Sequence, residues 1–419
     1  MISHADLTRR LEKLANSAAL SACSSQEVLA SSSTNHSNPE ARAEEVNDEF
    51  EKGKVVTHSI NDVERHEAER RFPAADATKA HIVPRAIELS TLSEVATATM
   101  NFSPDRKIYA GSFGNVYKGM LPDGQEVAIK RKRVDSGARG TDAFHAEVRV
   151  LSPLHHKHII RLVGCCVMDK EEHPFWKKKI VEERILIFEY MKNGSLSDHL
   201  HGPSTSSSSS SSYSPSPVVS SWKTRIEILL GVSRAIEYLH SYAVPPVIHH
   251  GIRPSNILLD SSWSPRLSSF DVAVQVGCFG EVEAGEISSS TTVFGTLGYL
   301  DPEYLVTGQV RPASDVYSFG VVMLEVLSGR GPIFYSMEHG DGPMDLVCQA
   351  LPLIDAGQLL HLLDRRPAEE PTPRQLEAAD LVARTAAHCL QENGDDRPAM
   401  SDVVTRLQAA LELVRCDDE

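Results

Sequence analysis

A glycine-rich stretch in the first half of the chain is followed by a lysine and a glutamate in an order that suits phosphate binding. The stretch reads GSFGNVYKG, residues 111–119, and glycines between two strands let backbone N–H groups approach a phosphate closely. Lys130 ends the apolar run VAIK, and Glu147 lies on the helix expected next. There it can partner a lysine that must stay charged in a buried cleft. Each signal is weak by itself, because a glycine-rich hairpin is commonly only a tight turn.

The elements that must position these residues change in type along the chain. Strand patterns dominate first, and Asp123–Gly124 is a strong hairpin signal. The expected strands cover residues 107–119, 125–134, 159–168 and 184–191. Helical periodicity over 141–154 interrupts them, and from Trp222 onward helices prevail. Strands first and helices later predict an α+β chain with two lobes.

Composition excludes several classes of protein. The 419 residues carry a net charge of −15, and the pI is near 5.6, so we expect no nucleic-acid partner. The seven cysteines are odd in number and lack CxxC spacing, which disfavours a disulfide framework or a zinc site. No run of about 18 apolar residues occurs, and the first residues lack a signal-peptide core. We therefore expect no direct membrane span and a cytoplasmic location.

Two polar stretches lack the large apolar side chains that offset the entropy of ordering. Residues 1–86 are expected to be mostly disordered, apart from one short helix whose apolar face would hold Leu7, Leu11, Leu14 and Ala18. The Ser-rich insertion 202–221 is expected to be a mobile surface loop.

The full series of motifs gives a more specific result than any one of them. In order they read GSFGNVYKG, EVAIK, AEVRVLSPLHHKHIIRLVG, IFEYMKNGSLSDHLHG, PPVIHHGIRPSNILLD, GTLGYLDPEY, SDVYSFGVVMLEVLSG and DDRPAM. The series resembles a protein kinase domain of the plant receptor-like group, and within it the Crinkly-four-related kinase-like proteins. The resemblance implies a bilobal protein-kinase fold, with a β-rich N-lobe and hinge over 87–191 and a helical C-lobe over 192–415.

The resemblance assigns nucleotide-binding roles to residues that match the family's motifs. Lys130 would contact the α- and β-phosphates and pair with Glu147, and Asn256 would hold a second magnesium. Phe188 would be the gatekeeper residue. The other ATP-binding positions are Gly111 and Gly114 over the phosphates, Val116, Ala128 and Leu258 around the adenine, and Glu189 to Met191 in the hinge.

The resemblance also assigns structural roles. Glu303 would pair with Arg397, and Asp315 would anchor the backbone of the catalytic loop. The stacked hydrophobic spine of the family would include Leu151, His249 and Phe270.

Two carboxylates that the family uses for catalysis are missing. Gly251 stands where the catalytic Asp should be, and glycine cannot orient a substrate hydroxyl or accept its proton. Ser269 stands where an Asp bridges magnesium to the phosphates, and a neutral hydroxyl is a poor ligand for a hard cation. Asp271 could substitute for it, but a two-residue strand shift of about 6–7 Å argues against direct ligation.

Three further positions depart from the family pattern. Tyr109 occupies the first position of the glycine loop, where its ring would either lie over the nucleotide or pack outward. Arg253 replaces a lysine that touches the γ-phosphate, so the charge survives with a different geometry. His250 replaces an arginine that docks phosphorylated activation loops, which puts control by that route in doubt.

The losses favour a pseudokinase that acts as a signalling scaffold or allosteric partner of other protein kinases or membrane receptor kinases. Binding of ATP stays possible, whereas magnesium binding is doubtful. The alternatives are a weak or atypical Ser/Thr kinase that uses Asp271 and Asn256 for metal, and a nucleotide sensor without turnover. A partner could recruit the protein to the plasma membrane, and it could phosphorylate residues 288–292 of the activation segment.

Overall fold

The computed structural model describes a large part of the chain. The described residues are 88–89, 91–111, 114–132, 137–172, 179–202, 216–276, 295–335 and 343–416. The chain divides into two compact units, Met1–Val83 and Pro84–Glu419, and every described residue belongs to the second unit. The disorder and short helix predicted for residues 1–86, and the candidate phosphorylation sites 288–292, lie outside the described residues.

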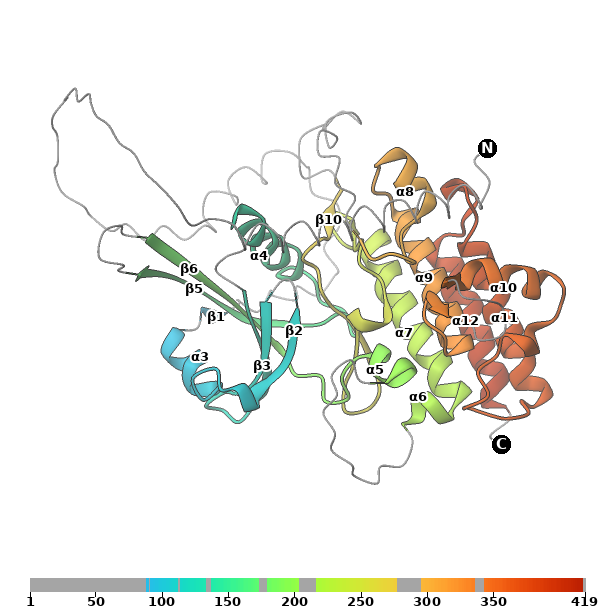
Figure 1. Ribbon diagram of the computed structural model, residues 1–419, viewed down its shortest axis with the longest axis horizontal. Helices are drawn as coiled ribbons and strands as arrows, with labels where there is room; N and C mark the ends of the chain where they lie inside the picture. Colours follow the sequence, from blue (N-terminus) through green and yellow to red (C-terminus); the bar gives the residue numbers. More distant parts are fainter. Residues whose placement is uncertain are drawn as a thin grey trace, which may run out of the picture. The chain divides into compact units, whose positions relative to one another are not determined.

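A six-stranded sheet forms the N-terminal part of this unit (Figure 1). Its strands are β1 (Glu88–Leu89), β2 (Lys107–Gly111), β3 (Gly114–Met120), β4 (Glu126–Arg131), β5 (Leu162–Glu172) and β6 (Lys179–Glu189). The order is β1-β5-β6-β4-β3-β2, in which β2 to β6 are antiparallel and the short β1 runs parallel to β5. Helices α3 (Leu92–Ala98) and α4 (Gly137–Leu151) accompany the sheet.

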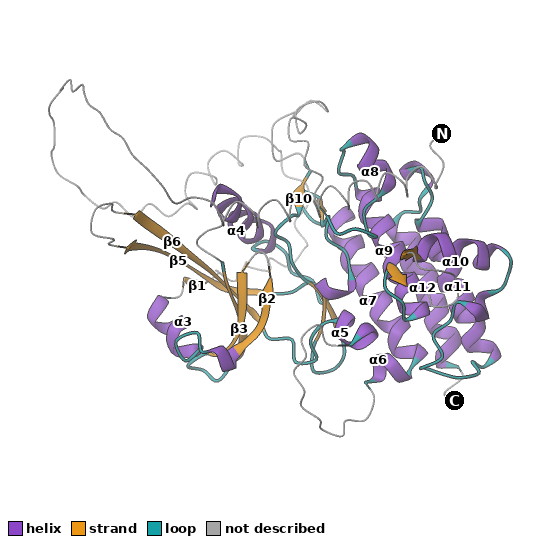
Figure 2. Cartoon of the chain, viewed as in Figure 1, coloured by secondary structure: helices purple, strands orange, loops and turns teal. Residues whose placement is uncertain are grey.

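Helices dominate the remainder, as Figure 2 shows in purple. They are α5 (Leu196–His201), α6 (Pro217–Ser220), α7 (Trp222–Ser241), α8 (Pro302–Thr307), α9 (Pro312–Ser328), α10 (Leu346–Asp355), α11 (Pro373–Cys389) and α12 (Met400–Arg415). Three short two-stranded sheets accompany them: β7 (Val247–Ile248) with β10 (Val274–Gln275), β8 (Ile257–Leu259) with β9 (Pro265–Leu267), and β11 (Ile333–Tyr335) with β12 (Pro343–Asp345). The predicted α+β bilobal architecture is confirmed.

Local sequence explains the central helix, α9. Pro312 occupies its first turn, where the missing N–H costs nothing, and Gly329 ends it in the left-handed conformation at φ 66°. Nearly all of its side chains are buried, as its apolar run predicted, because α7, α10 and α11 pack around it. This helix therefore forms the centre of the helical lobe.

Alternation along β4 separates two faces of the sheet. Val127 and Ile129 point into a small apolar cluster that includes Val95 of α3. Ala128 and Lys130 lie on the opposite face, because successive side chains of a strand alternate. Ala128 packs there against the large core that continues through α7 and α9. The lysine that the sequence singled out thus lies on the face that meets the helical lobe.

The Ser-rich insertion differs from its prediction at its end. Residues 203–215 lie outside the described part, but Pro217–Ser220 form α6, and Val218 is fully buried. The cause is Arg225 on α7, whose side chain is itself fully buried and donates through Nε to the Val218 carbonyl at 2.6 Å. The expectation of a loop without core contacts is therefore wrong for this end of the insertion.

In the described part of the chain, no helix combines the length and apolarity needed to cross a membrane.

Candidate functional site

The site centres on the ammonium group of Lys130 on β4. Its Nζ lies 3.1 Å and 3.0 Å from the two carboxylate oxygens of Glu147 on α4. Glu147 is buried, with 1% of its side chain exposed, and its Oε2 is also 3.5 Å from the Nζ of Lys132. The predicted pair is therefore formed, and it ties α4 to the sheet.

Charge is balanced within this buried group. Burial by itself would lower the pKa of Lys130, but the carboxylates of Glu147 and then Asp271 outweigh it and raise that pKa above its ordinary value. For Lys132, burial and the nearby charge of Lys130 lower the pKa. Lys130 is thus held as the permanent cation of the site.

Sheet register places Tyr109 on the same face as Lys130. Tyr109 pairs with Val116, and Val116 pairs with Lys130, so the three side chains share one face across β2, β3 and β4. A Cβ built on Gly111 would meet the Tyr109 ring at 2.6 Å, so the ring folds along β2 against that glycine. Its exposed fraction is 59%. The ring thus lies on the face of the sheet that carries Lys130, and whether it covers a nucleotide stays a prediction.

Asp315 on α9 fixes the backbone of the loop that carries Gly251. Its Oδ2 accepts the N–H of His249 at 2.7 Å, and its Oδ1 accepts the N–H of His250 at 2.8 Å. Burial opposes the charge on Asp315, but the hydrogen bond and charge of His240 outweigh it, so the pKa of Asp315 is lowered. The predicted anchoring role of Asp315 is confirmed.

Gly251 leaves room where a side chain could stand. A Cβ built on it would meet its nearest neighbours, in Asn256 and His249, at 3.5 Å, which is ordinary van der Waals contact. Asn256 donates through Nδ2 to the Gly251 carbonyl at 2.7 Å, so the loop is held without an aspartate. Packing therefore does not require glycine at this position.

Beside this loop lies the segment Ser269–Phe270–Asp271. Phe270 is fully buried, and its ring meets that of His249 edge-on with centroids 4.6 Å apart. Leu151 of α4 belongs to the same apolar core, so the structure brings the three predicted spine residues into one buried core.

Asp271 lies close to the lysine, a contact that the sequence did not predict. Its Oδ1 is 3.9 Å from the Nζ of Lys130, and only 7% of its side chain is exposed. The distance to Lys130 does not test the offset of about 6–7 Å between positions 269 and 271 that argued against metal ligation. Ser269, with φ 65°, bends the chain before Asp271, and metal ligation by Asp271 stays a prediction.

The structure also shows the surroundings of the remaining predicted nucleotide residues. Ala128 pairs with Phe188 across β4 and β6, and both Ala128 and Leu258 are partly buried against the main core. Met191 is buried. Glu189 ends β6 and accepts the N–H of Arg161 at 2.8 Å. Their contacts with a nucleotide stay predictions.

The expected pair between Glu303 and Arg397 is not formed. Arg397 instead donates through Nη2 to Asp301 at 2.7 Å, whereas Glu303 binds Arg311 and the N–H of Gly394. Asp301 and Glu303 flank Pro302 in the sequence DPE. The buried side chain of Arg397 pairs with Asp301, which is the buried carboxylate of the two. The sequence-based expectation left out Asp301, the other carboxylate of that motif.

The donor groups near Lys130 fit a magnesium ion poorly. Magnesium prefers carboxylate and water oxygens in octahedral geometry. Here Ser269 and the amide oxygen of Asn256 offer only neutral ligands, and Asp271 is held by Lys130. Among the described residues no cluster of three or more His, Cys, Asp or Glu side chains could hold a metal.

Comparison with known proteins agrees with this geometry. Residues 102–407 match the family described as "Protein tyrosine and serine/threonine kinase". The chain belongs to the protein kinase family. More specifically, it is a protein kinase domain of the plant Ser/Thr receptor-like kinase type.

The most similar relatives include three from Arabidopsis thaliana. The kinase-like protein CCR3 is 44% identical over 337 residues, which are 78% of this chain and 39% of that protein. The serine/threonine-protein kinase-like protein CCR4 is 41% identical over 77% of this chain and 40% of that protein. The serine/threonine-protein kinase PBS1 is 40% identical over 75% of this chain and 62% of that protein. The chain thus spans about two fifths of the length of the first two relatives.

A double-mutant cycle tests the energy of the central ion pair. We expect Lys130→Met and Glu147→Gln to be coupled by about 1–3 kcal/mol in the free energy of unfolding, because each leaves a buried partner without its opposite charge. Urea unfolding of both single variants and the double variant measures this coupling. The matched control is Lys118→Met with Glu126→Gln, a partly exposed pair on the same sheet, for which we expect less than about 0.5 kcal/mol. Equal coupling in both cycles would contradict the central role of Lys130.

Proposed function

We propose that this kinase domain is a pseudokinase: it keeps the closed kinase scaffold and does not transfer phosphate at an ordinary rate. The observation that carries the proposal is Gly251. It lies on a loop that Asp315 and Asn256 hold in place, so the scaffold for a catalytic base is intact while the base itself is absent. Losing a general base and its orienting hydrogen bond costs on the order of 10² to 10⁴ in rate.

The second loss acts on a different part of the reaction. Phosphoryl transfer depends on metal ions that neutralise charge developing on the phosphates. Ser269 supplies no carboxylate for such an ion, and Asp271 is engaged with Lys130. Because the two losses affect the base and the metal separately, their effects on rate combine.

In this proposal the protein works through binding. The paired, charged Lys130 favours binding of ATP without magnesium, and the intact lobes suit contact with other protein kinases or membrane receptor kinases. The relatives CCR3 and CCR4 are themselves named kinase-like proteins. The cytoplasmic location expected from the sequence, with recruitment to the plasma membrane by a partner, stays a prediction.

Restoring both carboxylates tests the proposal. The purified protein should give only background transfer of labelled phosphate with magnesium or manganese. Gly251→Asp combined with Ser269→Asp should raise transfer by about 10² or more, because each returns one lost function. The Cβ at position 251 has room, and Asp tolerates the left-handed backbone of position 269.

The matched control carries Asn at both positions, which has the same size without the charge. Ordinary turnover by the unmodified protein, lost on Lys130→Ala, would refute the pseudokinase proposal.

Nucleotide binding has its own test. Saturating ATP should raise the thermal midpoint of the protein equally with and without magnesium, because Lys130 supplies the attraction and no strong metal ligand is free to add to it. A ligand at about 100 times its Kd stabilises a protein by about 2.7 kcal/mol, which a thermal melt detects. Lys130→Met should abolish the shift. A shift that requires magnesium would contradict metal-independent binding, and no shift at all would leave a scaffold without nucleotide.

A second candidate function is favoured by the position of Asp271. Its carboxylate lies 3.9 Å from Lys130 Nζ, close to the group that the resemblance assigns to the phosphates. A weak Ser/Thr kinase could therefore use Asp271 together with Asn256 for metal.

Asp271→Asn discriminates this candidate. If trace transfer with manganese is detected, the substitution should abolish it and leave the ATP-induced thermal shift in place. Asp105→Asn, at an exposed position, is the control and should change neither. Trace transfer that survives Asp271→Asn would exclude this mechanism.

A further inference from the structure

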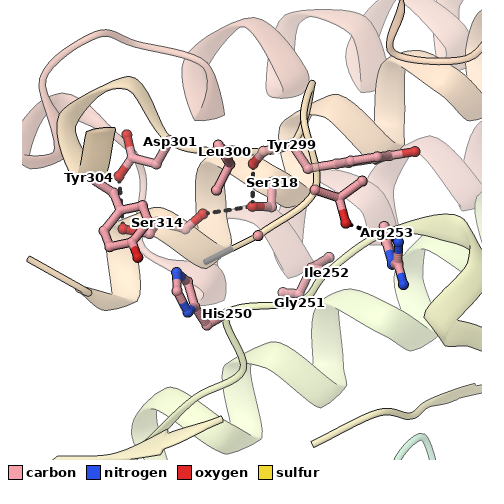
Figure 3. Close-up of a pocket in the computed structure, with 12 residues that line it drawn as sticks. His250, Gly251, Ile252, Arg253, Tyr299, Leu300, Asp301, Tyr304, Ser314 and Ser318 are labelled. Atoms are coloured by element: carbon pink, nitrogen blue, oxygen red, sulfur yellow. Dashed lines mark hydrogen bonds between the residues drawn. The ribbon is translucent and has the colours of Figure 1, made fainter. Parts of the chain in front are cut away.

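A pocket lies between the loop that carries Gly251 and the segment before α8 (Figure 3). One wall is the run His250, Gly251, Ile252 and Arg253, and the facing wall includes Tyr299 and Ser318. In Figure 3 His250 and Arg253 lie at opposite ends of the loop wall, with Gly251 between them. Gly251, at the position of the lost catalytic aspartate, therefore forms part of one wall of the pocket.

Arg253 gives this pocket a positive charge. Arg253 is half-buried and donates through Nη1 to the Thr296 hydroxyl at 2.9 Å. In the part of the chain that the structure describes, no carboxylate forms an ion pair with Arg253. Asp301 also lines the pocket, but Arg397 neutralises it at 2.7 Å. The guanidinium of Arg253 is therefore the uncompensated charge of the pocket.

Gly251 is the reason that this charge stays uncompensated. An aspartate at that position would place a carboxylate on the same wall as Arg253, and the backbone has room for one. Its absence changes the local balance by one negative charge and frees the volume of a side chain. A site that repelled anions with aspartate in place would attract them with glycine.

A second polar group on the loop wall is unsatisfied. The Nε2 atom of His250 is buried without a hydrogen-bond partner. Burial lowers the pKa of His250, so the ring is neutral near pH 7, and a neutral imidazole can donate through one nitrogen. Leaving such a nitrogen unpaired costs free energy that a ligand oxygen could recover.

We propose that this pocket binds the phosphate of a phosphorylated serine or threonine side chain on a partner protein, held by Arg253. The proposal rests on the pseudokinase function, because an active kinase would have to release such a side chain as its product. It names the chemistry of the partner that the scaffold recognises: a segment that another kinase has already phosphorylated.

Phosphate suits this pocket better than a carboxylate. A phosphorylated side chain carries about −1.5 to −2 charges and three acceptor oxygens at neutral pH. Arginine can meet two of those oxygens at once with parallel N–H groups, which lysine cannot do. The Arg253 guanidinium keeps donors beyond the one used on Thr296. Binding should therefore discriminate a phosphoserine from aspartate or glutamate at the same position.

The experiment compares short peptides that differ only at a central residue: phosphoserine, serine, aspartate or glutamate. An array of such peptides with varied flanking residues identifies one binder, and calorimetry with the full chain then measures its affinity. Charge-assisted hydrogen bonds contribute about 1.5–3 kcal/mol, so phosphoserine should bind about tenfold to a hundredfold more tightly than serine.

Matched variants locate the binding. Gly251→Asp should weaken phosphopeptide binding by about tenfold or more, because it returns a repelling carboxylate beside Arg253. Gly251→Asn fills the same volume without charge and should retain binding. Arg253→Gln should lose the preference for phosphoserine. Thermal melts of each variant confirm that it is folded before binding is compared.

Several results would overturn the proposal. Equal affinity for phosphoserine and serine peptides would do so, as would equal affinity for the aspartate peptide. Binding unchanged by Arg253→Gln would place the site elsewhere. Equal losses in Gly251→Asp and Gly251→Asn would show that volume, and not charge, matters.

Phosphate transfer is measured in parallel on the same samples. Transfer without phosphopeptide binding refutes the pocket and the pseudokinase together. Neither transfer nor binding refutes the pocket alone.

Discussion

The buried ammonium of Lys130 is the interaction on which the arrangement of the lobes depends. It joins strand β4 to helix α4 through Glu147, and to the segment after β9 through Asp271. Taking charges out of water is costly, and the cost is recovered only when opposite charges meet in good geometry. The site is therefore stable only while all three elements stay together. That requirement keeps β4, α4 and the segment of Asp271 together whether or not phosphate is transferred.

The fold can be kept while catalysis is lost, because different residues hold the fold and act on the substrate. Asp315 fixes the catalytic loop through backbone N–H groups, and those bonds do not depend on the side chain at position 251. Asn256 likewise bonds to a carbonyl of the loop. A residue that acts only on substrate can therefore change without loosening the fold. The same separation explains why a kinase scaffold can acquire a new binding preference at its former reaction centre.

Motif spacing predicted the fold and the Lys130–Glu147 pair well, because those features follow from strand and helix periodicity and from a fixed order of segments. It failed where two chemically similar residues lie close together. Both Asp301 and Glu303 could have paired with Arg397, and burial decided between them. It also gave no sign of the contact between Asp271 and Lys130, because the left-handed backbone of Ser269 is invisible in a strand pattern. The orientation of Tyr109 needed the register between β2 and β3, which no single sequence fixes.

The anchoring of α6 indicates where a fluorescent reporter could be inserted into this chain. Leu200 of α5 and Val218 of α6 are both buried in the main core, and the two short helices pack together. The segment between them thus leaves and re-enters the lobe at neighbouring points, and the entropy of closing such a loop grows only slowly with its length. We expect that a fluorescent reporter inserted between residues 203 and 215 would not strain the fold of the domain. Partner association could then be followed in living cells without fusing anything to either terminus.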